Sequence, residues 1–295
     1  MTYPYDYAVI GGDMRQVYLV REFALRSNHV CHYALIEAPD AQACTAAASL
    51  EELCQASSCI IGPVPLCRSG AFLNQAAFGE PVFTDQLLDS LNPGQSFFAG
   101  SIPETFKCTA AEKGIRIYDL MLDPSLTVYN TIATAEGAIC EAIRLSPLNL
   151  HHSRCAVLGY GRCGRTLTYY LKGMSCHISV ISNTEEKRAQ AALIADQTAA
   201  LADFGMYAPE FDFIFNTIPQ QVVTRELLAG MKPSVTIIDI ASAPGGVDLK
   251  AASELGIHSA LCPGLPGKYA PASSAKALRE AIERIVQAKE LPHGR

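Results

Sequence analysis

The segment that most constrains the fold is a glycine-rich stretch in the middle of the chain, Gly159-x-Gly161-x-x-Gly164. An apolar run over 154–158 precedes it, and a helix-forming run follows. Strand, glycine turn and helix in this order are typical of a dinucleotide-binding βαβ unit. There the glycines allow a tight turn, close backbone approach to a pyrophosphate, and close packing of helix on strand. The sequence therefore predicts a parallel α/β domain with a dinucleotide at a helix N-terminus. The alternative is a glycine turn that binds no ligand.

Cofactor contacts are expected on the glycine loop and at the ends of the neighbouring strands, where dinucleotides lie in such folds. The candidates are Gly159, Tyr160, Gly161, Arg162, Cys163, Gly164, Ser182, Asn183, Thr184, Arg188, Asn216, Thr217, Pro219 and Ala241. Cys163 lies at the start of the helix, where the helix N-terminus favours a thiolate. We therefore expect Cys163 to be sensitive to oxidation.

The end of the second strand of this domain bears on the choice between NADP and NAD. A site that prefers NAD usually carries Asp or Glu there, whereas this chain has Ser182-Asn183-Thr184, followed by Lys187-Arg188. Hydroxyls and cations suit a 2′-phosphate, which a carboxylate would repel. NADP is therefore favoured, with NAD still open. The alternative is that Lys187 and Arg188 are solvated residues of the following helix.

Composition limits the classes of protein to consider. The 295 residues suffice for about two domains of 100–200 residues. With 49% apolar and 18% charged residues and a net charge of −6, the chain is neither disordered nor suited to bind nucleic acid. It has no run of about 20 apolar residues for a membrane span, and no signal-type N-terminus. The eleven cysteines form no Cys-x-x-Cys, so we expect no metal site, and mainly core thiols in a reducing cytoplasm.

Strand and helix patterns alternate along both halves of the chain. This alternation predicts two Rossmann-like, doubly wound parallel-sheet domains, residues 1–130 and 131–271. Residues 44–56 look helical, and residues 123–130 look like a linker. The helix that follows the linker, over 131–145, is apolar nearly all round and is expected to be buried between the domains. A C-terminal helix over 272–290 has one apolar face, with which it would pack back on the first domain.

Several residues are candidates for binding a small substrate. The turn Gly11-Gly12-Asp13 opens a helix whose first turn carries Arg15, an arrangement that suits a carboxylate. The alternative is a surface arginine after a tight turn. Ser242, Gly245 and Gly246 follow another strand of the second half, where a double glycine would let backbone approach a ligand. The alternative there is a plain Pro-Gly-Gly turn.

The order of several motifs resembles a known family. The motifs are Gly-Gly-Asp-x-Arg-Gln at 11–16, Asn-Thr-Ile-x-Thr-x-Glu-Gly at 130–137, Asn-Thr-Ile-Pro at 216–219, Ala-Ser-x-Pro-Gly-Gly at 241–246 and Pro-Gly-Leu-Pro-Gly-x-x-Ala-Pro at 263–271. Together they resemble the family of the A subunit of dipicolinate synthase over essentially the whole chain. A more distant resemblance is to D-2-hydroxyacid dehydrogenases, which share two similar α/β domains and an interdomain helix.

The resemblance implies a reaction, a partner and a location. The reaction is the NADP-dependent oxidation of 4-hydroxy-tetrahydrodipicolinate, a small dicarboxylate, to dipicolinate. The partner is the B subunit of dipicolinate synthase, which is flavoprotein-like, and the location is the cytoplasm of the mother cell of a spore-forming bacterium. A homo-oligomer is also expected.

Catalytic candidates are fewer than binding candidates. A dicarboxylate needs cations and backbone N–H groups, which Arg15, Lys268 and the turn at Ser101 would supply. Glu136 and Thr134 open the interdomain helix, and Glu136 is either a base or a partner of the helix dipole. The acid–base histidine of the D-2-hydroxyacid dehydrogenases is not evident, because the chain has Cys-Pro-Gly-Leu at 262–265. Two alternatives stay open: a D-2-hydroxyacid-type dehydrogenase, and a catalytically silent NAD(P)-binding protein that regulates a flavoprotein partner.

Overall fold

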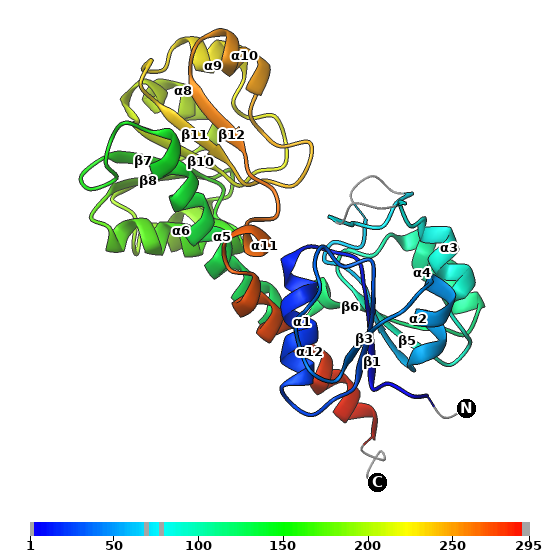
Figure 1. Cartoon of the computed structure of the whole chain (residues 1–295). Coiled ribbons are helices and arrows are strands. Elements are labelled where there is room, and N and C mark those ends of the chain that lie inside the picture. The colour runs from blue at the N-terminus through cyan, green and yellow to red at the C-terminus, as the bar shows by residue number, and fades with distance from the viewer. Residues whose placement is uncertain (1–2, 68–70, 77–79, 291–295) are drawn as a thin grey trace. The chain divides into compact units, whose positions relative to one another are not determined.

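The chain divides into two compact units (Figure 1). A computed structural model describes residues 3–67, 71–76 and 80–290, without the side chains of the last two. Met1–Tyr129 and Ala270–Arg295 form the first unit, and Asn130–Tyr269 forms the second. Among the described residues, no helix is both long and apolar enough to cross a membrane.

The first unit is built on a six-stranded parallel sheet. Its strands, in spatial order, are β3 (Cys44–Ala46), β2 (Val30–Tyr33), β1 (Tyr7–Ile10), β4 (Cys59–Ile61), β5 (Ser96–Ala99) and β6 (Arg116–Asp119). Its helices are α1 (Met14–Ala24), α2 (Leu50–Ala56), α3 (Thr84–Ser90), α4 (Glu104–Glu112) and the C-terminal α12 (Pro271–Glu290). Apolar side chains of α12, including Leu278 and Ile282, pack in one core cluster with Val20 and Phe23 of α1.

The second unit repeats the same sheet order. Its strands are β9 (Gln197–Ala199), β8 (His177–Ile181), β7 (Arg154–Leu158), β10 (Phe213–Asn216), β11 (Thr236–Asp239) and β12 (His258–Leu261). Its helices are α6 (Arg162–Gly173), α7 (Glu185–Ala191), α8 (Phe204–Tyr207), α9 (Arg225–Ala229), α10 (Leu249–Glu254) and α11 (Leu265–Tyr269). The short 3₁₀ helices are Leu120–Leu122 in the first unit and Leu201–Asp203 and Ala208–Glu210 in the second. Counted along the chain from β1 or from β7, both sheets have the strand order 3-2-1-4-5-6 of doubly wound dinucleotide-binding folds, so the predicted fold class is confirmed.

Two local predictions are wrong. Residues 44–46 form the edge strand β3, and only Leu50–Ala56 is helical, because Ser49 caps that helix by accepting from the Glu52 N–H. The expected linker at 123–130 is helical and belongs to α5 (Pro124–Leu145). Asp123 accepts from the Leu126 N–H, and Pro124 fits the first helical position.

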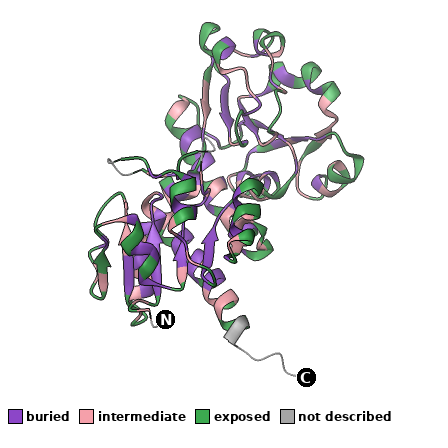
Figure 2. Cartoon of the chain, turned by 90° about the vertical axis from the view of Figure 1, so that its right-hand side faces the viewer, coloured by how far each residue is buried: buried purple, intermediate pink, exposed green. Residues whose placement is uncertain are grey.

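Helix α5 is buried along one face rather than all round. Ala135, Ala138 and Ala142 are buried, whereas Ile132 and Ile143 are exposed. In the burial view the strands are mostly purple and the outer helix faces green, as expected for parallel sheets covered by helices (Figure 2). The apolar face of α5 that packs is therefore built from small residues.

No disulfide joins any of the cysteines, all of which lie in the described part of the chain. Five of them are buried, as the core interpretation expects, but Cys108 and Cys140 are exposed on helices α4 and α5.

Candidate dinucleotide-binding site

The glycine triplet joins β7 to α6, and each glycine has a different reason to lack a side chain. Gly159 has φ +91°, and a Cβ there would overlap the Thr217 hydroxyl. A Cβ on Gly164 would overlap the carbonyl oxygen of Gly159, so this glycine lets the helix pack on the loop. A Cβ on Gly161 would meet nothing within 4 Å. Packing within the chain therefore requires the first and third glycines but leaves Gly161 facing open space.

The N-terminus of α6 is suited to an anion. Gly161 is the N-cap residue and has extended backbone, and no side chain caps the helix there. The first backbone N–H groups of a helix have no acceptor within the helix, and they carry partial positive charge. Open space at Gly161 and an uncapped N-terminus beside it fit the pyrophosphate of a dinucleotide.

The other loop residues surround this helix start. Tyr160 is buried in the apolar core of the unit, and the Arg165 guanidinium lies 5.5 Å from the centre of its ring. Arg162 is exposed at the helix start. The prediction for Cys163 is wrong: desolvation raises the pKa of its thiol, and the neighbouring Arg162 only partly offsets this effect. Burial therefore opposes the thiolate that the sequence predicted at this helix start.

The end of β8 holds the residues expected near a 2′-phosphate. Ser182 is buried, and Asn183 and Thr184 are exposed. The Arg188 side chain turns back from α7 and donates from Nη1 to the Ser182 carbonyl oxygen at 2.7 Å. Lys187 is exposed. Arg188 is therefore fixed at the end of β8 by a hydrogen bond, whereas Lys187 extends into solvent.

Residues at the end of β10 shape a loop through their own side chains. Asn216 Oδ1 accepts from the Ile218 N–H at 3.1 Å, and its Nδ2 donates to the Ile218 carbonyl at 3.0 Å. The Thr217 hydroxyl donates to the Leu158 carbonyl at 2.9 Å, which ties this loop to the glycine loop. Pro219 is exposed. Asn216 and Thr217 therefore position the backbone here, a role the sequence prediction did not specify.

The double glycine after β11 packs against the same loop. A Cβ on Gly246 would overlap the Asn216 amide and the Ile218 carbonyl, and the Gly246 N–H already donates to Asp239. Gly245 has φ +88° and lies against the Asp239 carboxylate. Ala241 is buried, and Ser242 is exposed. Packing therefore accounts for both glycines, while Ser242 faces solvent as a binding residue would.

In the first unit Arg15 has a carboxylate partner within the chain. The residue is 5% exposed, and its guanidinium binds the Asp13 carboxylate, with Nε to Oδ1 at 2.9 Å and Nη2 to Oδ2 at 2.8 Å. It also donates to the Val64 carbonyl. Asp13 caps α1 as well, so the helix N-terminus is already matched by a carboxylate. Arg15 therefore stabilises the turn, and its role in holding a substrate carboxylate stays a prediction.

The Ser101 turn is held by a buried aspartate side chain. The Ser101 and Ile102 N–H groups donate to the Asp119 carboxylate at 2.9 and 3.0 Å. These N–H groups already have an acceptor within the chain, and a role of this turn in binding a substrate carboxylate stays a prediction. Ser101 itself has φ +50° and is exposed.

Lys268 is part of an ion cluster centred on Glu141, which the sequence does not indicate. The Glu141 side chain is 3% exposed; it pairs with Lys268, accepts from the Tyr269 hydroxyl at 2.7 Å, and pairs with Arg144 at 2.8 Å. The hydrogen bond from Lys268 is the main reason why the pKa of Glu141 falls to about 2, and the pKa of Lys268 is raised in return. A Cβ on Gly137 would lie 2.8 Å from the Tyr269 ring. Contacts of Gly137 and Glu141 with Lys268 and Tyr269 therefore join α5 to α11.

We expect Glu141→Gln to lower the free energy of unfolding at pH 7 by about 2 kcal/mol, since it removes hydrogen bonds to a charged group. Because the pKa of Glu141 is depressed in the folded state, its contribution is complete above the unfolded value, about 4.3, and declines as the pH falls toward 2. Urea unfolding at pH 7 and pH 3 should show a smaller difference between wild type and variant at pH 3.

The matched control is Glu254→Gln, in which the carboxylate pairs with Arg225 and both side chains are about half exposed. Its expected effect is below about 0.5 kcal/mol. Equal losses for the two variants at pH 7 would contradict a special role for the Glu141 cluster.

The remaining catalytic candidates also have local partners. The Thr134 hydroxyl donates to the Asn130 carbonyl one turn earlier in α5, at 2.8 Å. Glu136 is exposed, and its carboxylate contacts the Tyr170 hydroxyl, whose pKa is raised by desolvation and by this carboxylate. Among the described residues, neither Thr134 nor Glu136 forms a hydrogen bond or an ion pair with Lys268.

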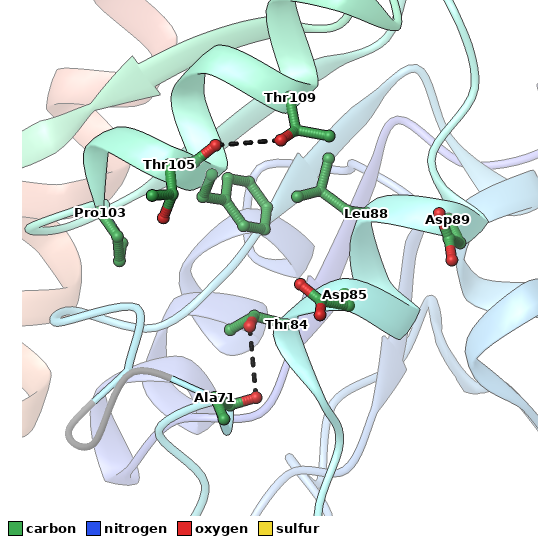
Figure 3. Close-up of a pocket in the computed structure, with 9 residues that line it drawn as sticks. Ala71, Thr84, Asp85, Leu88, Asp89, Pro103, Thr105 and Thr109 are labelled. Carbon is green, nitrogen blue, oxygen red and sulfur yellow. Dashed lines mark hydrogen bonds between the residues drawn. The ribbon is translucent and has the colours of Figure 1, made fainter.

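The first unit contains a cavity of about 550 Å³ between α3 and α4 (Figure 3). Its lining residues are Ala71, Thr84, Asp85, Leu88, Asp89, Pro103, Thr105, Phe106 and Thr109. The charged groups of this lining are carboxylates, and Asp89 is paired with Lys113 at 2.5 Å. A dicarboxylate would be repelled here, so this cavity is not a candidate for the predicted substrate.

The second unit has the sheet order and the glycine loop that are typical of Rossmann-like dinucleotide-binding domains. Residues 128–251 match the family model described as the NAD binding domain of D-isomer specific 2-hydroxyacid dehydrogenases. Residues 6–121 match the model of the N-terminal domain of the A subunit of dipicolinate synthase.

Several known proteins are similar to this chain over nearly its whole length. The A subunit of dipicolinate synthase from Bacillus subtilis (strain 168) is 28% identical over 291 residues, which cover 96% of this chain and 97% of that protein. The crystal structure of the Bacillus subtilis A chain has a TM-score of 0.82 at 26% identity, covering 98% of each chain. That of the Bacillus halodurans protein has a TM-score of 0.85 at 24% identity, covering 97% of this chain and 99% of that one. The resemblance to the A subunit of dipicolinate synthase is confirmed, and the matches support an oxidoreductase with a nicotinamide cofactor.

Proposed function

We propose that the chain is an NADP-dependent oxidoreductase that forms dipicolinate from 4-hydroxy-tetrahydrodipicolinate. The observation that carries this proposal is the open, uncapped helix start at Gly161, in a chain whose similarity to the A subunit of dipicolinate synthase spans 96% of its length. The reaction removes one water, transfers one hydride to the cofactor and releases one proton, which leaves an aromatic ring.

The chain's own residues would bind and orient the cofactor and the substrate, rather than activate the substrate chemically. Backbone N–H groups at the start of α6 would bind the pyrophosphate, since no side chain caps them. The loops after β10 and β11 would hold the nicotinamide end, because these strands lie on the side of β7 opposite to β8. A bound nicotinamide supplies the hydride acceptor. Aromatisation makes the product side favourable, so positioning of the donor carbon is the main task of the protein.

Arg188 is the residue we propose for the 2′-phosphate. Its guanidinium is held at the end of β8 by the Ser182 carbonyl, which leaves other N–H groups for a phosphate. Replacing Lys187 and Arg188 together with alanine should raise the Kd for NADP about tenfold and that for NAD less than about twofold, as for one lost charge-assisted contact.

Calorimetric titration with each cofactor measures both dissociation constants. The single variant Lys187→Ala is the control, because that side chain is exposed; it should change little. Equal weakening of NADP and NAD in the double variant would contradict the assignment.

A second candidate function is a catalytically silent, dinucleotide-binding protein that regulates a flavoprotein partner. The observation in its favour is that Lys268, Thr134 and Arg15 are all engaged by other groups of the chain. Because the relatives are named as the A subunit of an enzyme, a partner is implied, and in this proposal it is the B subunit of dipicolinate synthase. A cytoplasmic location and a homo-oligomer remain part of the proposal.

Steady-state turnover separates the two candidates. Purified chain, NADP and freshly generated 4-hydroxy-tetrahydrodipicolinate should produce dipicolinate and NADPH in equal amounts, followed by absorbance and by product analysis. Binding of NADP with no turnover by the chain alone, but turnover on adding the flavoprotein, would favour the regulatory function. No turnover under either condition, with NADP bound, would contradict the proposed reaction.

A further inference from the structure

Asp239 lies at the end of β11, outside the motifs that suggested the cofactor site. Its side chain is almost completely buried, with 1% of the residue exposed. Among the described residues no lysine or arginine pairs with it; its carboxylate instead accepts four N–H groups. A buried carboxylate is costly unless hydrogen bonds satisfy its oxygens, so this arrangement needs all four donors in place.

The four donors come from the end of β10 and from the loop after β11. Oδ1 accepts from Asn216 Nδ2 at 2.9 Å and from the Ala241 N–H at 3.0 Å. Oδ2 accepts from the Gly246 N–H at 2.7 Å and from the Val247 N–H at 3.2 Å. Asn216 in turn binds both backbone groups of Ile218. One carboxylate therefore joins the loop after β10 to the loop after β11.

The glycines make this junction tight. A Cβ on Gly245 would lie 2.8 Å from Asp239 Oδ2, and one on Gly246 would overlap the Asn216 amide. The two loops thus pack directly on the carboxylate and on each other. They are also the loops that, in the proposed function, hold the nicotinamide end of the cofactor.

We propose that Asp239 is the positioning residue for the nicotinamide half of the cofactor site. This inference rests on the proposed function. In this proposal the buried Asp239 carboxylate fixes the backbone geometry of residues 216–219 and 241–246. The glycine loop and the end of β8 hold the adenosine half of the cofactor independently of Asp239. Asp239 acts through these loops and needs no contact with the substrate.

Asp239→Asn is the direct test because it keeps the shape and changes one acceptor into a donor. Whichever way the amide is turned, its NH₂ group faces two N–H donors, so one loop must move away. We expect the Kd for NADP to rise about tenfold or more, and that for adenosine 2′,5′-bisphosphate, which lacks the nicotinamide half, to change less than about twofold. Calorimetric titration of the whole chain measures both.

Two further variants complete the test. Gly246→Ala leaves the carboxylate in place but separates the loops. It should therefore also raise the Kd for NADP and leave the Kd for adenosine 2′,5′-bisphosphate nearly unchanged. Asp212→Asn is the matched control: this carboxylate, just before β10 at the opposite sheet edge, accepts from the Arg154 N–H at 2.9 Å and pairs with Lys232. It should leave both dissociation constants unchanged.

The outcomes are distinguishable. Retained binding of adenosine 2′,5′-bisphosphate with weakened NADP supports the inference and shows that the unit is folded. Equal weakening of both ligands, or of neither, by Asp239→Asn overturns it while leaving the proposed function intact. Failure of the wild-type chain to bind either ligand overturns the proposed function, and the inference with it.

Discussion

Gly161→Val is expected to abolish dinucleotide binding and to leave the second unit folded. The backbone of Gly161 is extended with φ −82°, which valine adopts readily, and a Cβ there meets nothing within 4 Å. The added side chain would instead occupy the space in front of the uncapped α6 N-terminus. We expect the Kd for NADP to rise about 100-fold or more, since the pyrophosphate would lose its approach to the backbone N–H groups.

Calorimetric titration with NADP and thermal unfolding, both measured on the same preparation, check both halves of this expectation. Gly173→Val is the matched control, because Gly173 ends the same helix and a Cβ there also meets nothing within 4 Å. It should have unchanged affinity. NADP binding by Gly161→Val at wild-type strength would remove the cofactor site from this loop.

Arg279→Met is expected to cause a large loss of stability in the first unit. Arg279 of α12 is 1% exposed and is surrounded by three carboxylates, those of Glu22 on α1 and of Glu280 and Glu283 on its own helix. Methionine retains much of the apolar stem but leaves these carboxylates without their cation. We expect the free energy of unfolding to fall by about 3 kcal/mol, as when one partner of a buried ion pair is removed.

Urea unfolding gives this energy, and hydrogen exchange of α12 shows whether the helix is released from α1. Arg284→Met is the control on the same helix, since Arg284 pairs with Asp123 at 2.6 Å but is 55% exposed. Its cost should stay below about 1 kcal/mol. A similar cost for both variants would contradict the role given to burial.

The fold and the loop around Gly161 were predictable because their signals are local in sequence. Glycines at fixed spacing after an apolar strand report the backbone geometry directly. The partners of charged residues could not be predicted in this way. Lys268 is neutralised by Glu141, more than a hundred residues away in the chain, and no spacing rule reveals that pair.

Other differences between prediction and structure have signals that are present in the sequence. Asp13 stands two residues before Arg15, a spacing at which the helix cap and the guanidinium share one carboxylate. Asp123-Pro124 is a helix start within the segment predicted as a linker. Asp239 is visible as an acidic residue ending an apolar strand, but its four donors are known only from the folded loops.

A structure of the chain with NADP and dipicolinate bound tests the central claim most directly. The account predicts the pyrophosphate within hydrogen-bond distance of the backbone N–H groups at the start of α6, with the nicotinamide beside the loops after β10 and β11. Arg188 should contact the 2′-phosphate. A dinucleotide bound at another edge of the second sheet, or none at saturating concentration, would contradict the account.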